Sequence, residues 1–343
     1  MLDTLKLLVH DFEVKDSSCL QVQLGSYKVS GSEVIEHPLF KTDSHIHYGS
    51  KAYLNEDNWN LTIKPVRDGS IGAYLSFSIP KNYYGDNYYS VGEQGSKAVI
   101  GKLEKELEER GIGASLQDAD LSRVDTFKNI EPEEPFSSYH PLFNTLQVRR
   151  AVKRNFGTTF LSSNTQQEHC IYDKLEEMKN LKKPVAGLPN TMRFEHRLLS
   201  KRKVADTYGF TKVKDLFKGG YEVVREKQME SWRESLFQYE VDEVIALGSK
   251  QIEQEMRAFW KLNNTRWLDS YLKAYGAYSL VAVAGIDAVL DAIKSIERDN
   301  RMKVHRLKNT LLEAQRTMMM NKQGKDKTLG NLYVELKEKV LNG

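Results

Sequence analysis

Short runs in which apolar and polar residues alternate fill the first 80 residues of the chain. These runs lie at 2–9, 19–24, 61–65 and 71–79, and clusters of Gly, Ser, Asn and Asp separate them. Alternation with a period of two is typical of strands with one buried face, because successive side chains point to opposite sides of a sheet. The pattern therefore predicts that the chain begins with a sheet.

The period changes to that of a helix at 97–110, where Val99, Leu103 and Leu107 fall along one side and glycines follow the last turn. We expect this helix to lie across the sheet. The pattern then predicts four more elements: a strand at 120–129, a helix that follows Pro132 and carries the apolar residues of 142–148, a hairpin of strands at 158–162 and 168–173, and a strand at 190–199.

Apolar residues recur three and four positions apart from residue 201 onward. The helical segments lie at 223–237, 241–262, 267–296 and 303–320. We therefore expect an α+β fold, with an antiparallel-rich sheet and packed helices over residues 1–200 and an all-helical region over 201–343. The repeated order of strand, helix and strand leaves open a duplicated βαβ-type unit.

Composition favours a soluble chain in a reducing compartment. Cys19 and Cys170 are too few for a disulfide framework and lack the spacing of a metal site. The N-terminus has an acid at position 3 and a short apolar run, which predicts a first strand rather than a signal peptide. The longest apolar run, 275–289, is interrupted by two glycines and an aspartate, so it falls short of the roughly 20 residues that cross a bilayer. We expect a cytoplasmic protein with no membrane partner.

Positive charge is concentrated in the middle of the chain. The net charge is only +3, but residues 147–233 carry 19 Lys and Arg against 10 Asp and Glu. Such an excess is often a solvated surface, and it also suits a polyanion such as nucleic acid. Charge alone leaves both interpretations open.

The segment NTMRFEHR, at 190–197, places a carboxylate between two guanidiniums. On a strand, Arg193, Glu195 and Arg197 share one face, while Met192 and Phe194 take the other. In isolation this pattern is typical of a salt-bridge ladder on a half-buried strand. Two other charged strands, SRVD and IYDK, change that interpretation.

Those strands contribute Asp125 and Tyr172. If they are neighbours of the NTMRFEHR strand, Asp125 and Glu195 can hold Mg²⁺ or Mn²⁺, because hard cations prefer oxygen ligands. Tyr172 can then attack a phosphodiester, with Lys174 on the same strand face lowering the pKa of the phenol. We assign DNA contacts to Arg123, Arg193, Arg197, Lys201, Arg202 and Lys203.

Two other segments offer rival chemistry. The stretch NYYGDNYYS, at 82–90, has four tyrosines around a Gly-Asp turn, and they are either alternative nucleophiles or a packed hairpin loop. His45 and His47 lie one residue apart, like the His-hydrophobe-His metal-binding element of many rolling-circle nucleases, or are incidental in a polar hairpin. The carboxylates remain our first choice of metal ligands.

The ordered motifs MLDTLKL, LSRVD, IYDKLEE and MRFEHRLLSKRKV resemble the gene II-type replication initiators of filamentous phages and their relatives, including the phage X-type replication proteins. The resemblance covers about residues 1 to 220. It implies an enzyme that nicks one strand of a supercoiled origin, leaves a 3′-hydroxyl for a polymerase and rejoins the displaced strand. It also implies a tyrosine nucleophile and a divalent metal, which we carry to Tyr172, Asp125 and Glu195, with Lys174 assisting.

The expected partners are origin DNA, as supercoiled duplex and single strand, together with a host helicase and polymerase. We expect the helical region 201–343 to serve origin binding or dimerisation, and a homodimer is left open. The alternative function is a non-catalytic DNA-binding regulator on the same scaffold, which would bind DNA in a salt-sensitive manner without breaking it.

Overall fold

The computed structural model describes residues 1–23, 27–28, 47–48, 51–65, 71–144, 146, 148–239, 286–296, 302–309 and 329–342. It divides the chain into two compact units, each assembled from segments that lie far apart in the sequence. Unit 1 comprises Met1–Lys128, Ser163–His169 and Glu195–Gln228, and unit 2 comprises Asn129–Ser162, Cys170–Phe194 and Met229–Gly343.

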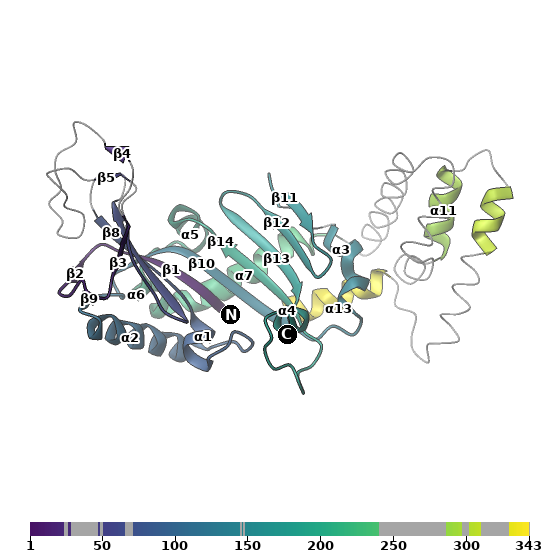
Figure 1. Ribbon diagram of the computed structural model, residues 1–343. Coiled ribbons are helices and arrows are strands. Elements are labelled where there is room, and N and C mark those ends of the chain that lie inside the picture. The colour runs from purple at the N-terminus through teal and green to yellow at the C-terminus, as the bar shows by residue number, and fades with distance from the viewer. Residues whose placement is uncertain are drawn as a thin grey trace. The chain divides into compact units, whose positions relative to one another are not determined.

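Among the described residues the strands and helices follow the sequence pattern closely (Figure 1), whereas the predicted helical segment 241–262 and parts of 267–296 and 303–320 lie outside them. The strands are β1 (Leu2–Val9), β2 (Phe12–Val14), β3 (Gln21–Gln23), β4 (Tyr27–Lys28), β5 (His47–Tyr48), β6 (Lys51–Asn55), β7 (Trp59–Pro65), β8 (Ile71–Ser78), β9 (Ile112–Ala114), β10 (Asp120–Ile130), β11 (Val152–Asn155), β12 (Thr159–Ser163), β13 (Gln167–Asp173) and β14 (Met192–Leu198). The helices are α1 (Ile79–Tyr84), α2 (Glu93–Glu109), η2 (Phe136–Tyr139), α3 (His140–Asn144), α4 (Lys174–Asn180), α5 (Lys201–Tyr208), α6 (Val213–Asp215), η3 (Leu216–Gly220), α7 (Tyr221–Ser235), α11 (Ile286–Ile296) and α13 (Leu329–Leu341).

The main sheet has the strand order β11-β12-β13-β14-β10-β1-β8-β7-β6-β3. The pairs whose register is described run antiparallel, so they give no support to a duplicated parallel βαβ unit. The predicted α+β class is confirmed, with helices packed on an antiparallel sheet and helices in the described parts beyond residue 200.

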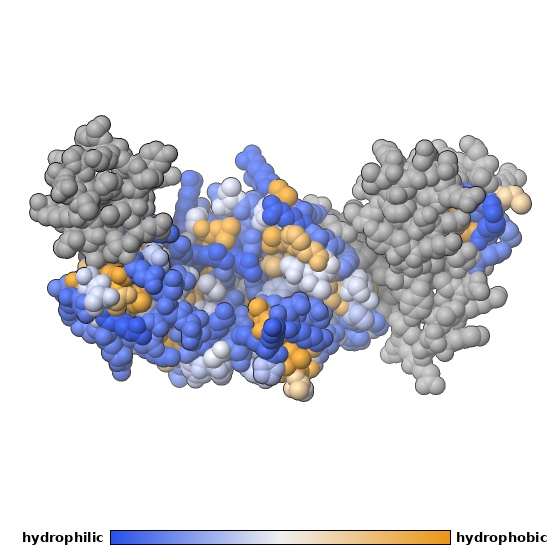
Figure 2. Space-filling view, viewed as in Figure 1, coloured by the Kyte–Doolittle hydropathy of each residue, from blue (hydrophilic) through white to orange (hydrophobic). Residues whose placement is uncertain are grey.

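Strand β1 lies at the centre of unit 1, between β8 and β10. Its alternate residues Leu5, Leu7 and Val9 are buried, as the period of two predicts. Helix α2 buries Val99 and Leu103, among others, in the same core. The opposite side of α2 is hydrophilic (Figure 2), which is the amphipathic arrangement expected of a helix lying across a sheet.

Unit 2 has a core of its own that is rich in aromatic side chains. Phe194 of β14 packs edge-to-face on Trp232 of α7, with ring centroids 5.1 Å apart. Tyr333 of α13 and Phe143 of α3 join the same core. Aromatic rings bury a large apolar area each and prefer such tilted contacts, so this cluster is a major source of cohesion in unit 2.

The helix predicted over 142–148 is shorter than its apolar pattern suggested. The chain forms a 3-10 turn, η2, and then α3, which ends at Asn144. Leu146 is nevertheless buried in the core of unit 2, and Val148 packs against it. Burial rather than helix continuation explains the apolar spacing of these two residues.

Cys19 and Cys170 are both free thiols. Within the described ranges, no helix is long and apolar enough to cross a membrane. Nicking chemistry in residues 1–200 and origin binding or dimerisation in 201–343 stay predictions.

Two glycines provide a matched test of the backbone. Gly85 caps α1 with φ +85°, whereas Gly101 lies inside α2, and a Cβ at either position would meet nothing within 4 Å. We predict that Gly85→Ala lowers the free energy of unfolding by about 1 kcal/mol, because a side chain disfavours positive φ. Gly101→Ala should raise it by about 0.5–1 kcal/mol, because alanine loses less backbone entropy in a helix. Urea denaturation of both variants checks the signs, and a change of the same sign for both would contradict this account.

Candidate functional site

Strands β13, β14 and β10 are adjacent in the main sheet, which is the arrangement that chemistry shared among them requires. Hydrogen bonds continue the β13–β14 pairing beyond the strand ends. Leu199 N donates to Gln166 O at 2.8 Å, and Lys174 N donates to Thr191 O at 2.9 Å. The polar side chains described next come from unit 1, where segments of these three strands meet.

Arg123 and Asp125 form a two-pronged ion pair on β10. The Arg123 Nε and Nη2 atoms donate to the two carboxylate oxygens of Asp125 at 2.8 and 2.7 Å. The two residues share a strand face, as their spacing predicts. Asp125 is only 3% exposed, so the guanidinium replaces much of the water that this carboxylate has lost.

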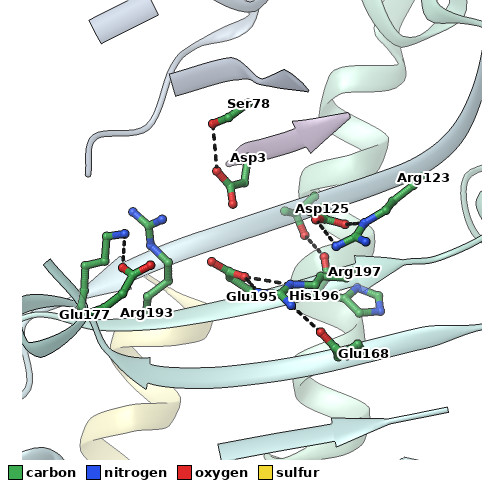
Figure 3. A network of polar contacts seen from close by, with 12 residues as sticks. Asp3, Ser78, Arg123, Asp125, Glu168, Glu177, Arg193, Glu195, His196 and Arg197 are labelled. Atoms are coloured by element: carbon green, nitrogen blue, oxygen red, sulfur yellow. Dashed lines mark hydrogen bonds and ion pairs between the residues drawn. The ribbon is translucent and has the colours of Figure 1, made fainter. Parts of the chain in front are cut away.

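Arg197 joins two carboxylates from neighbouring strands. Its guanidinium donates to Glu195 on β14, with Nε 2.9 Å from Oε2, and its Nη1 donates to Glu168 Oε1 on β13 at 2.5 Å (Figure 3). Glu195 is 1% exposed. The alternation of β14 therefore places Glu195 and Arg197 on one face, where they form an ion pair. This is part of the salt-bridge ladder that the R-x-E-x-R pattern is typical of.

Asp3 is a third buried carboxylate that the sequence analysis did not single out. It accepts a long hydrogen bond from Ser78 Oγ at 3.5 Å (Figure 3). The register of β1 against β10 shifts between Leu2 and Leu5, and this irregularity lies at Asp3. An acid beside Leu2 in an otherwise apolar first strand was the available signal.

Arginines hold the paired carboxylates of this group: Arg123 binds Asp125, and Arg197 binds both Glu168 and Glu195. Burial raises the pKa of the Asp125 carboxyl, and Glu195 adds to this rise, whereas Arg123 and Arg197 oppose it. The carboxylates are therefore close enough to repel one another in a region with little water.

The donor chemistry of the cluster suits a hard divalent cation. Asp125 and Glu195, the predicted ligands, supply buried carboxylate oxygens, which Mg²⁺ and Mn²⁺ prefer. In the part of the chain that the structure describes, no three His, Cys, Asp or Glu groups form a ready-made metal site. A cation at Asp125 and Glu195 would therefore have to compete with the guanidiniums that now hold them.

The two predicted catalytic residues belong to unit 2. Tyr172 is 7% exposed near the end of β13, and Lys174 Nζ lies 5.7 Å from the centre of its ring. The prediction that Lys174 continues the strand face is wrong, because Asp173 caps α4 and Lys174 is the first residue of that helix. Lys174 is fully buried and donates to Glu177 Oε2 at 2.5 Å.

The residues assigned to DNA contacts differ in their surroundings. Arg193 is buried and donates to Asn129 Oδ1 at 2.8 Å. Lys201 pairs with Asp120 at 2.5 Å, whereas the Arg202 side chain is 86% exposed at the start of α5. Lys203 is half-buried. Among the six, Arg202 is the most open to solvent, and the contacts with DNA remain a prediction.

The rival tyrosines lie on α1 and in the loop that follows it. Tyr83 and Tyr84 end α1 instead of lining a hairpin loop, so that prediction is wrong. Tyr84 and Tyr89 are about half exposed, whereas Tyr88 is buried. His45 lies outside the described residues. His47 lies in β5, but its side chain is also outside the description.

Two histidines on β13 and β14 were also missed. His169 and His196 stack with ring centroids 4.5 Å apart and are both buried. Burial and the positive charge of Lys203 lower the pKa of His196 to about 3, so the ring is neutral at physiological pH. The two rings lie at strand positions of the opposite parity to Glu168 and Glu195, so they face away from the carboxylate cluster.

Asp120, at the start of β10, is a useful contrast to Asp125. It accepts hydrogen bonds from His10 Nε2 at 2.8 Å and Lys201 Nζ at 2.5 Å, and Lys212 Nζ lies 3.0 Å away. Burial raises the pKa of Asp120, but these partners outweigh burial and hold the pKa at about 2. This carboxylate is compensated, whereas Asp125 is not fully so.

We predict that Asp120→Asn lowers stability at pH 7, whereas Asp125→Asn does not. Because the pKa of Asp125 is raised on folding, its ionised form weakens the fold, and neutralisation should not lower the free energy of unfolding. The lowered pKa of Asp120 contributes about 2 kcal/mol, which is present above about pH 4 and is lost as the pH falls toward 2. Asp120→Asn should lose at least that amount and flatten this acid dependence. Urea unfolding across this pH range provides the measurement, and equal losses in both variants would contradict the charge assignment.

Comparison with known proteins finds no family model that matches the chain and no curated protein that matches it. The resemblance to gene II-type initiators therefore rests on short motifs, and any function has to be argued from the side chains of this chain.

Proposed function

We propose that this chain is a replication initiator, which nicks one DNA strand at a replicon origin and rejoins it during rolling-circle replication. The observation that carries the proposal is the buried pair of carboxylates Asp125 and Glu195, whose negative charges interact on the neighbouring strands β10 and β14. Burying two carboxylates near each other costs free energy, and such sites are common where a protein binds a cation or performs chemistry.

Asp125 and Glu195 are the proposed ligands of Mg²⁺ or Mn²⁺. When bound, the cation would polarise the scissile phosphate and stabilise the charge that develops on it. Arg193 and Arg197 are the proposed contacts of flanking phosphates, because guanidinium groups bind phosphate oxygens in pairs.

Tyr172 is the proposed nucleophile. Its phenolic oxygen would form a bond to phosphorus while the bond to the 3′-oxygen breaks, and the departing oxygen would take up a proton to become a 3′-hydroxyl. The nearby cation of Lys174, 5.7 Å from the ring centre, would favour the phenolate. The tyrosyl ester conserves the phosphodiester energy, so a later 3′-hydroxyl can displace the tyrosine and reseal the strand.

Capture of the covalent product tests this function without knowledge of the origin sequence. The protein is incubated with Mg²⁺ or Mn²⁺ and a supercoiled plasmid library that carries fragments of the DNA encoding it. DNA that stays attached through detergent and phenol extraction is sequenced, and the attached peptide is identified by mass. We expect adducts at one origin sequence, attachment at Tyr172 and loss of the adduct in the presence of EDTA.

Variants separate the proposed roles. Tyr172→Phe should reduce the adduct at least about 100-fold while DNA binding is retained, and Asp125→Asn and Glu195→Gln should do the same. Asp118→Asn, a matched change at an exposed acid, should have no effect. Adduct formation that survives Tyr172→Phe but is lost in Tyr84→Phe or Tyr89→Phe would move the nucleophile to α1 and its loop. DNA retention without any metal-dependent break would instead favour the non-catalytic regulator.

A further inference from the structure

The outward face of β1, β6, β7 and β8 carries lysines and tyrosines in close contact. Lys6 Nζ and Lys64 Nζ lie 5.5 and 4.6 Å from the centre of the Tyr74 ring, and Lys51 Nζ lies 5.7 Å from that of Tyr53. We call these five residues the lysine–tyrosine face. All of them belong to unit 1, as does the carboxylate cluster.

The strand register sets this face out in rows. Tyr53 pairs with Thr62, and Thr62 pairs with Tyr74, so the two rings lie in one row across β6, β7 and β8. Side chains of the same parity on these strands point to one side of the sheet, and this side is opposite to the buried Leu61 and Leu75. Both tyrosines are half-buried, whereas Lys51 and Lys64 are exposed.

No carboxylate occurs among the outward side chains in the described residues of β6, β7 and β8. These side chains are Lys51, Tyr53, Asn55, Asn60, Thr62, Lys64, Tyr74, Ser76 and Ser78. Burial lowers the pKa of Lys6, and repulsion from Lys64 and Arg123 adds to this effect. The cations thus repel one another across the face, so a polyanion would relieve a cost that the fold already bears.

The face leads directly to the carboxylate cluster. Lys6 pairs in register with Arg123, and Arg123 holds Asp125. A ligand that spans the face therefore ends beside Arg123 and its partner Asp125.

We propose that the lysine–tyrosine face binds single-stranded DNA and guides it to the carboxylate cluster. A single strand offers both phosphates for the lysines and open base faces for the tyrosine rings, whereas a duplex hides its base faces and an acidic peptide has none. This inference rests on the proposed function and specifies the form of its substrate.

Fluorescence anisotropy with a labelled oligothymidine 15-mer tests the proposal, in EDTA so that binding is separated from strand breakage. Wild-type protein should bind the single strand more tightly than a blunt duplex of equal length. The double variant Lys6→Gln/Lys64→Gln should bind roughly tenfold more weakly, and its dependence of log K on log salt should be shallower by about 1.4, because each lost phosphate contact removes about 0.7.

Tyr74 variants test stacking. Tyr74→Leu should weaken binding roughly 5- to 100-fold with little change in salt dependence, and Tyr74→Trp should retain it, because every aromatic face can stack on a base. Lys105→Gln, on the exposed side of α2, and Tyr84→Leu are the matched controls and should bind as wild type. Thermal unfolding of each variant verifies that it is folded. If Tyr74→Leu does not fold, Tyr74→Trp and the double lysine variant still test the proposal.

Three results would overturn the proposal: no binding of the single strand, tighter binding of the duplex, or equal affinity in the face variants and the controls. Loss confined to Tyr84→Leu would overturn it as well. The two proposals can fail independently. Binding of single-stranded DNA on this face without a covalent adduct would contradict the nickase function but support the binding face. Covalent adducts without binding that depends on this face would contradict the binding face but support the nickase function.

Discussion

The site depends on ion pairs in which arginine guanidiniums replace the water that the buried carboxylates have lost. Asp125 and Glu195 are almost completely inaccessible, and each is held by an arginine two positions away on its own strand. An ion pair of this kind seldom adds much net stability, because removing both charges from water costs about as much as their attraction returns. These ion pairs on β10 and β14 are therefore weak contributors to the stability of the fold.

Sheet geometry makes this arrangement feasible. Residues at positions i and i+2 of a strand share a face, so Arg123 reaches Asp125 and Arg197 reaches Glu195 without any loop. Antiparallel neighbours then bring Glu168 within reach of Arg197. The register of β1 against β10 also shifts between Leu2 and Leu5, the stretch that holds the buried Asp3. If β1 alternated regularly from Leu5, the side chain of Asp3 would point toward the core. The alternation therefore gave no reason to expect a carboxylate of β1 at the site.

Much of the fold followed from periodicity, and the exceptions have local physical causes. The strands around Leu5, Leu75 and Phe194 were predictable, because alternation records which face is buried. The position of Lys174 at the start of a helix was not predictable from the sequence. Asp173 caps that helix, but in the sequence a capping aspartate cannot be distinguished from any other polar residue at the end of a strand. Tyr83 was assigned to a loop for a similar reason, because the short helix α1 owes its start to a Ser78 cap and a proline.

The site was partly predictable for the same reason. Glu195 and Asp125 could be proposed from strand parity, but their pairing with arginines depends on strand order, which short motifs do not encode. The stacked His169 and His196 lie on different strands, so no local pattern announced them. The lysine–tyrosine face was likewise hidden, because Lys6, Tyr53, Lys64 and Tyr74 come from four strands and meet only through register.

We propose that the buried carboxylates bind a cation in competition with the arginines that pair with them, and Mn²⁺ binding tests this proposal most directly. Calorimetric titration of the full chain should give one Mn²⁺ per chain, with affinity at least about tenfold weaker in Asp125→Asn and in Glu195→Gln and unchanged in Asp118→Asn. Arg197→Met should bind Mn²⁺ more tightly than wild type, because the competing guanidinium is gone. No bound Mn²⁺, or equal affinity in all of these variants, would contradict the claim.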